Sequence, residues 1–128
     1  MKLRKLLDKV LQAPFLARQE RLIRNRRDSS RAEFISSFSA RETDLAAHVW
    51  QALRVEAVVP DFRPDPRDDL CEVYGLAEGD LDDFVLDLLN AFNCRVPDPT
   101  ETAGMRPVRT VADVVSFASR FRSDGRGR

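Results

Sequence analysis

One residue type limits acid–base and nucleophilic chemistry in this chain. His48 is the only histidine among 128 residues, so a catalytic pair would need Cys71 or a serine beside it. No local motif brings a nucleophile to His48. We interpret His48 as an ordinary structural or surface histidine, and we expect a protein that is not an enzyme and has no catalytic residues.

The candidate metal ligands also lack a supporting pattern. Cys71 and Cys94 form neither a disulfide framework nor a Cys-x-x-Cys pair, and we expect both to be buried thiols. Asp80, Asp83 and Asp87 have a helical spacing that could share a hard cation, but an EF-hand loop with its central Gly and terminal Glu is absent. We expect no metal and no cofactor.

Charge is balanced over the whole chain and segregated along it. The 21 Lys and Arg match the 21 Asp and Glu, giving a formal net charge of zero. The net charge is nevertheless +7 over residues 1–32, −1 over 33–54, −10 over 55–104 and +4 over 105–128. An asymmetry of this kind is informative about binding partners more than about the fold.

Hydrophobic residues recur at helical spacing throughout, which predicts an all-α domain. In the first helix the apolar positions are Leu3, Leu6, Leu7, Val10 and Leu11. In the helix of residues 81–92 they are Leu81, Phe84, Val85, Leu88, Leu89 and Phe92. Pro14 is predicted to end or kink the first helix, and Phe15, Leu16, Gln19, Leu22 and Ile23 to continue in a second amphipathic stretch.

Capping signals mark where the other helices begin. Ser30 with Glu33, Ser39 with Glu42, and Thr110 with Asp113 each match the capping box. Three prolines between residues 60 and 66 predict an extended loop, and residues 123–128 are predicted to be a disordered tail.

No apolar run is long enough to cross a bilayer, and charges interrupt the only leucine cluster that a secretory signal could use. We therefore expect a cytoplasmic protein.

The order of elements resembles the acyl carrier protein family over roughly residues 39–121. The resemblance lies in a helix at 39–55, a long proline-bearing loop, an acidic helix start after Tyr74-Gly75-Leu76, an aromatic-to-proline segment at 92–97 and a final helix that opens with Thr110-Val111. It implies a small acyl-carrier-like bundle over residues 39–122. Residues 1–38 would be a basic amphipathic helical extension.

The residue that carries the prosthetic group in that family is missing. Carrier proteins attach phosphopantetheine to the serine of an Asp-Ser-Leu motif. Here Glu78 stands at that position in the ungapped register, and Asp80 stands there after a slip of two residues. Between Ser39 and Ser116 the chain has no other serine. The expectation is an atypical member without a phosphopantetheine site, and the alternative is a genuine acyl or peptidyl carrier modified at an unexpected hydroxyl.

In the family, the second helix docks on basic patches of partner enzymes, so the resemblance implies that its acidic residues bind a partner. These residues are Glu78, Asp80, Asp82, Asp83 and Asp87. The implied partner is a basic protein surface, for example on an acyl-chain or polyketide enzyme. A solvated helix face that only maintains solubility is the competing interpretation.

The basic segment of residues 2–31 has three interpretations. It packs on the bundle near the acidic segment, it lies on anionic lipid, or it contacts nucleic acid. The first is favoured, and self-association is a further option for an electroneutral chain. The sequence leaves the membrane and nucleic-acid alternatives open.

Overall fold

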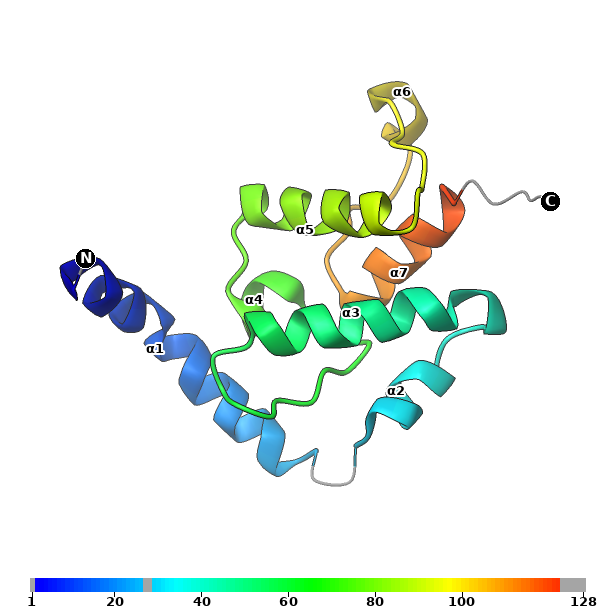
Figure 1. Cartoon of the computed structure of the whole chain (residues 1–128). Coiled ribbons are helices and arrows are strands. Elements are labelled where there is room, and N and C mark those ends of the chain that lie inside the picture. Colours follow the sequence, from blue (N-terminus) through cyan, green and yellow to red (C-terminus); the bar gives the residue numbers. More distant parts are fainter. Residues whose placement is uncertain (1, 27–28, 123–128) are drawn as a thin grey trace.

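The computed structural model describes the backbone of residues 2–26 and 29–122, with side chains from residue 13 onward. Within these ranges the chain folds into helices without a strand, and one isolated bridge pairs Asp69 with Thr110 (Figure 1). The predicted all-α class is confirmed. The helices are α1 (Lys2–Arg24), α2 (Arg31–Ser36), the 3-10 helix η1 (Ala40–Glu42), α3 (Thr43–Glu56), α4 (Leu70–Tyr74), α5 (Glu78–Ala91), α6 (Pro99–Thr102) and α7 (Val111–Arg120). The tail predicted at 123–128 lies outside the described residues.

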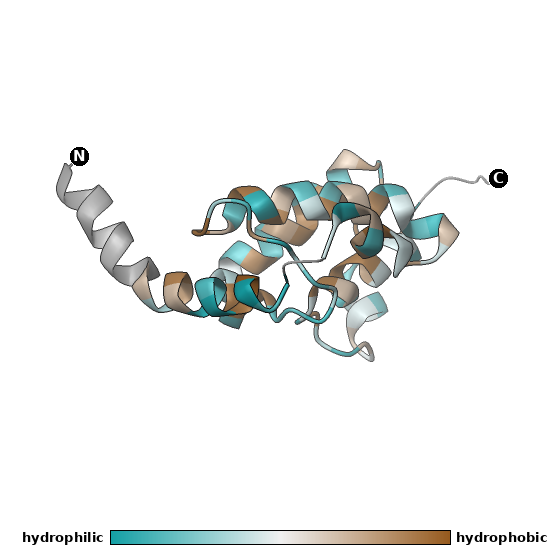
Figure 2. Ribbon diagram, turned by 90° about the horizontal axis from the view of Figure 1, so that it is seen from below, coloured by the Kyte–Doolittle hydropathy of each residue, from teal (hydrophilic) through white to brown (hydrophobic). Residues whose placement is uncertain are grey.

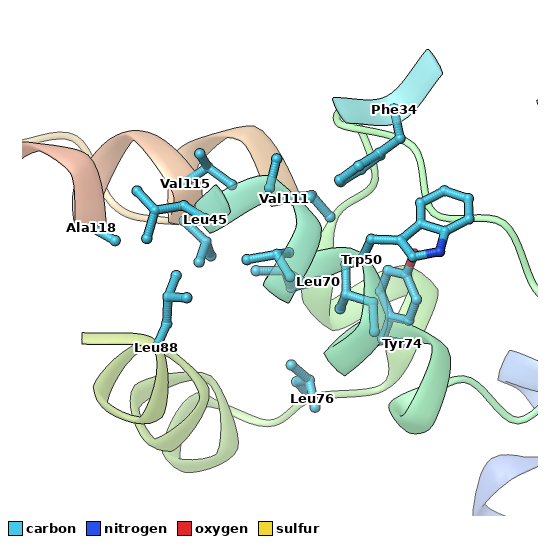
Figure 3. Close-up of a cluster of buried hydrophobic side chains, with 14 of the residues drawn as sticks. Phe34, Leu45, Trp50, Leu70, Tyr74, Leu76, Leu88, Val111, Val115 and Ala118 are labelled. Carbon is cyan, nitrogen blue, oxygen red and sulfur yellow. The ribbon is translucent and has the colours of Figure 1, made fainter. Parts of the chain in front are cut away.

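Helix α3 is the centre of the bundle and contacts α2, α5 and α7. Its buried side chains are Leu45, Ala46, Val49, Trp50 and Leu53. Figure 3 shows Phe34 of α2 facing Trp50, and the centroids of these two rings are 5.2 Å apart. The same view shows Leu88 of α5 pointing toward Leu45, with Val115 of α7 on the far side. Hydrophobic and hydrophilic residues alternate along the helices in Figure 2, as expected for helices with one buried face.

Of the two predicted effects of Pro14, a helix end is wrong, because α1 continues through Pro14 to Arg24. A kink at Pro14 stays a prediction. A proline inside a helix removes one backbone hydrogen bond and crowds the preceding turn. The helix beyond Pro14 is held by tertiary contacts instead, since Gln19 is fully buried and Leu22 and Ile23 pack against the core.

Among the described residues, no helix has both the length and the apolar character needed to span a bilayer.

The Gln19 carboxamide attaches α1 to two other segments. Its Nε2 donates to the carbonyl of Val73 at 2.7 Å, and its Oε1 accepts from the N–H groups of Val58 and Val59 at 2.9 and 3.0 Å. All three partners are backbone groups, and those of the buried residues Val59 and Val73 would otherwise be left without a hydrogen bond away from solvent. The second half of the basic segment is therefore part of the folded domain.

A second attachment is the buried ion pair between Arg26 and Asp68, both of whose side chains are largely shielded from solvent. Asp68 also accepts from the Tyr74 hydroxyl at 2.8 Å and from the N–H of Asp65 at 3.0 Å. Burial and the charge of Asp68 raise the pKa of Tyr74 above its ordinary value. Arg26 further donates to the carbonyl of Arg63 at 2.9 Å. The Asp68 carboxylate thus joins the turn that follows α1, the proline loop and α4.

Helix ends follow the predicted capping residues. The hydroxyls of Ser30 and Thr110 accept from the N–H groups of Glu33 and Asp113, each at 3.1 Å. At Ser39 the Glu42 carboxylate accepts from the Ser39 hydroxyl at 2.9 Å, and the helix begins as the short η1.

Helix α4 ends at Gly75, whose φ of 75° lies in the left-handed region. A Cβ atom there would lie 3.1 Å from the Phe15 ring of α1. Gly75 therefore fits both the helix end and the close approach of α1.

Candidate functional site

The acidic residues singled out in the sequence all lie on α5, and all five are exposed. The helix begins after the Gly75 turn, and Asp80 Oδ2 accepts from the N–H of Ala77 at 3.2 Å, which caps the first turn. Among the residues with described side chains, none of the five carboxylates forms an ion pair. Two arginines of the chain have other acidic partners: Arg26 pairs with Asp68, and Arg122 pairs with Asp44.

The five acids separate into two rows on opposite sides of α5. Asp80, Asp83 and Asp87 are spaced by three and four residues, so they share one face. They line a groove of about 560 Å³ together with Glu56 from the end of α3. Glu78 and Asp82 line a different groove of about 690 Å³ beside the segment of residues 96–108.

The first groove, which we call the acidic groove, combines its carboxylates with apolar side chains. The apolar lining consists of Phe15, Val58, Leu76 and Phe84, with the Tyr74 ring. Its described lining contains four carboxylates and no Lys or Arg. Glu56 and Phe15 were not identified from the sequence, because they come from helices whose packing against α5 the local pattern does not specify.

Helix α5 is also less buried than its hydrophobic pattern suggests. Only Leu88 and Leu89 are buried, whereas Leu81, Phe84, Val85 and Phe92 are half-buried at the edge of the core. Leu86 is 41% exposed, and Val96 across the second groove is 57% exposed. The exposed face of α5 therefore presents apolar contact area next to its charges.

The two positions at which the resemblance would place the carrier serine lie at the start of α5. Glu78 is the first residue of the helix and Asp80 lies in its first turn, and both side chains are exposed. The hydroxyls of the bundle lie elsewhere. Thr43 and Thr102 donate to the carbonyls of Ala40 and Pro99, each at 3.3 Å, and the Thr110 hydroxyl caps α7.

His48 and Cys71 do not form a nucleophilic pair. The His48 ring packs edge-on against Phe92 at a centroid distance of 5.4 Å, and it lines a small pocket that contains no cysteine or serine. Burial, followed by the charge of Asp69, raises the pKa of the Cys71 thiol, which is the opposite of what an activated thiolate needs. Cys71 is half-buried and Cys94 is buried.

Among the described residues, no group of three His, Cys, Asp or Glu side chains is placed to hold a metal ion. Asp80, Asp83 and Asp87 share a face, but their carboxylates do not converge on one point.

No family model, no curated protein and no solved structure matches this chain.

Proposed function

We propose that this protein is an atypical acyl-carrier-like protein without a phosphopantetheine site, which acts as a non-catalytic protein–protein interaction module. Its binding surface is the acidic face of α5, and its partner is a basic protein surface. The resemblance described above suggests an acyl-chain or polyketide enzyme as that partner.

The observation that carries the proposal is the acidic groove. Asp80, Asp83, Asp87 and Glu56 surround an apolar floor, and no described cation neutralises them. A solvated face that maintains solubility needs charge alone, whereas this surface pairs charge with half-buried Phe84 and Phe15. Aromatic contact area with a charged rim is the arrangement of a binding site for a cationic, partly apolar segment.

The contacts of the N-terminal segment also favour the acidic groove as the binding surface. Arg18 donates to the carbonyl of Glu72 and lies over the Phe15 ring at 5.7 Å, and Arg26 is held by Asp68. These two arginines are occupied by contacts within the chain and are withdrawn from binding lipid or nucleic acid. Arg18 and Arg26 thus contact residues other than the α5 acids.

The proposal predicts that neutralising part of the acidic groove weakens binding to a basic amphipathic helix. Asp83→Asn with Asp87→Asn should reduce the affinity for a synthetic Leu/Lys helical peptide by roughly fivefold to tenfold at low salt, because two uncompensated rim charges are lost. Isothermal titration calorimetry at low and high salt measures the effect, which should shrink as salt rises.

A matched control is Glu20→Gln with Glu72→Gln, which removes two exposed carboxylates outside the groove. This variant should bind within about twofold of the parent protein. Equal weakening by the two double variants would show that only net charge matters, and would count against a defined site.

The absence of a phosphopantetheine site is tested separately. Coexpression with a phosphopantetheinyl transferase should leave the intact mass unchanged, because Glu78 and Asp80 cannot attack the coenzyme A pyrophosphate as a hydroxyl does. Mass spectrometry of the purified protein is the measurement. A mass gain of one phosphopantetheine group would instead establish the alternative, a genuine carrier modified at another hydroxyl.

A further inference from the structure

A cleft of about 750 Å³ lies on the opposite side of residues 105–108 from the α5 surface, between η1 and α7. It adjoins the groove lined by Glu78 and Asp82, and residues 105–108, with Arg106 among them, and Phe117 line both. Its volume is in the range of about 300–1,000 Å³ that is typical of small-molecule sites.

The cleft gathers arginines from three different elements. Arg41 comes from η1, Arg106 from the loop before α7, and Arg120 from the last turn of α7, and all three are exposed. None of them forms an ion pair with a described carboxylate. By contrast, Arg26, Arg95 and Arg122 each have an acidic partner.

The two acidic residues in the cleft are engaged by the backbone. Glu42 accepts from the N–H and the hydroxyl of Ser39 at 3.3 and 2.9 Å. Asp113 Oδ2 accepts from the N–H groups of Arg109 and Thr110, each at 3.0 Å. Burial alone would raise the pKa of Asp113, but these donors, together with the nearby charge of Arg106, outweigh it and hold the pKa below its ordinary value. The carboxylates therefore serve the helix starts, and the guanidinium groups remain available for an external anion.

Hydroxyl and apolar groups complete the lining. Ser116 and Ser119 lie one turn apart on α7, and neither hydroxyl donates to a described residue. Met105, Val108 and Phe117 supply an apolar side. The cleft thus contains arginine guanidinium groups, serine hydroxyls that can donate to a ligand, and an apolar side.

We infer that this cleft binds a phosphate monoester with a small apolar or aromatic body. A phosphate monoester has nearly two negative charges and three outer oxygens, which match several arginine forks and the serine hydroxyls at once. A single carboxylate would pair with one arginine guanidinium and leave the other two arginines without a counter-charge. The apolar side then accepts the organic part of the ligand. This inference concerns a surface other than the acidic groove and does not depend on the proposed partner.

Phenyl phosphate is the probe for the test, with inorganic phosphate and benzoate as comparisons, and the full-length protein is titrated by calorimetry. Phenyl phosphate should bind more tightly than either comparison, since only phenyl phosphate offers both parts of the ligand. Arg41→Gln, Arg106→Gln and Arg120→Gln should each weaken its binding by about tenfold, which is the loss of one charge-assisted hydrogen-bonding group.

Arg21→Gln and Arg31→Gln are the matched controls, because both side chains are exposed and lie outside the cleft. Both should bind phenyl phosphate within about twofold of the parent. Thermal unfolding verifies that every variant is folded. The inference is overturned if phenyl phosphate does not bind, or if the controls weaken binding as much as the cleft variants. It is also overturned if an acidic polypeptide such as polyglutamate binds the arginines while phenyl phosphate fails to displace it.

Discussion

Deletion of residues 1–38 is expected to abolish the cooperative unfolding transition of this protein. The expectation is based on the contacts that α1 and α2 make with the bundle. Gln19 is 0% exposed and forms three hydrogen bonds with backbone groups of the remaining chain. Phe34 is 4% exposed and packs against Trp50.

The expected loss of stability can be estimated from these contacts. Loss of a buried aromatic side chain such as Phe34 costs about 3–5 kcal/mol. Each buried backbone group left without its Gln19 partner adds about 1–3 kcal/mol. The total approaches the whole stability of a small domain, which is about 5–15 kcal/mol.

Deletion of residues 1–12 is the matched control for this truncation. The shorter deletion keeps Phe15, Gln19 and Phe34, and therefore the contacts named above. Urea denaturation followed by circular dichroism should show a sharp transition for the control and none for the longer deletion. A normal transition in the protein lacking residues 1–38 would show that the bundle is independent of α1 and α2.

The second large effect is expected from Asp68→Ala, which should lower the free energy of unfolding by about 3–5 kcal/mol. The substitution leaves the Arg26 guanidinium without its counter-charge, and the Tyr74 hydroxyl without its acceptor. Breaking a buried pair from one side costs more than the pair itself contributes, because the remaining charge stays desolvated.

Two comparisons test the mechanism. Asp87→Ala removes an exposed carboxylate from α5 and should change the free energy of unfolding by about 0.5 kcal/mol or less. Asp68→Asn keeps the shape and one acceptor, and should fall between Asp87→Ala and Asp68→Ala. If Asp68→Ala proved as mild as Asp87→Ala, the buried network would be energetically neutral. Chemical denaturation of all three variants gives these values.

Local sequence signals predicted much of this fold. The hydroxyl caps at Ser30 and Thr110 form as the spacing indicated, because a capping box depends only on residues within one turn. The helical periodicity of α3 and α7 was also sufficient to predict these two helices, since each helix buries one continuous face. The chain between Pro60 and Pro66 forms a loop as predicted.

Features that depend on tertiary contacts could not be predicted from such local sequence signals. A helix through Pro14 is allowed by the packing of Gln19, and the burial of Gln19 itself depends on backbone groups 39 to 54 residues away. The acidic residues of α5 were identified from the sequence. Their helical spacing alone divides them into two rows, but the addition of Glu56 to one row and the grooves that the rows line required the positions of α3 and the loop of residues 96–108.

The distance along the chain between Gln19 and its partners has a consequence for synthesis. Translation adds roughly 5–20 residues per second, so the 54 residues that separate Gln19 from Val73 take about 3–11 seconds to make. During that interval α1 is present while its docking surface is not. A nascent chain paused between these two points therefore presents a basic segment with apolar residues, which the ribosome surface and chaperones can contact before its docking surface has been made.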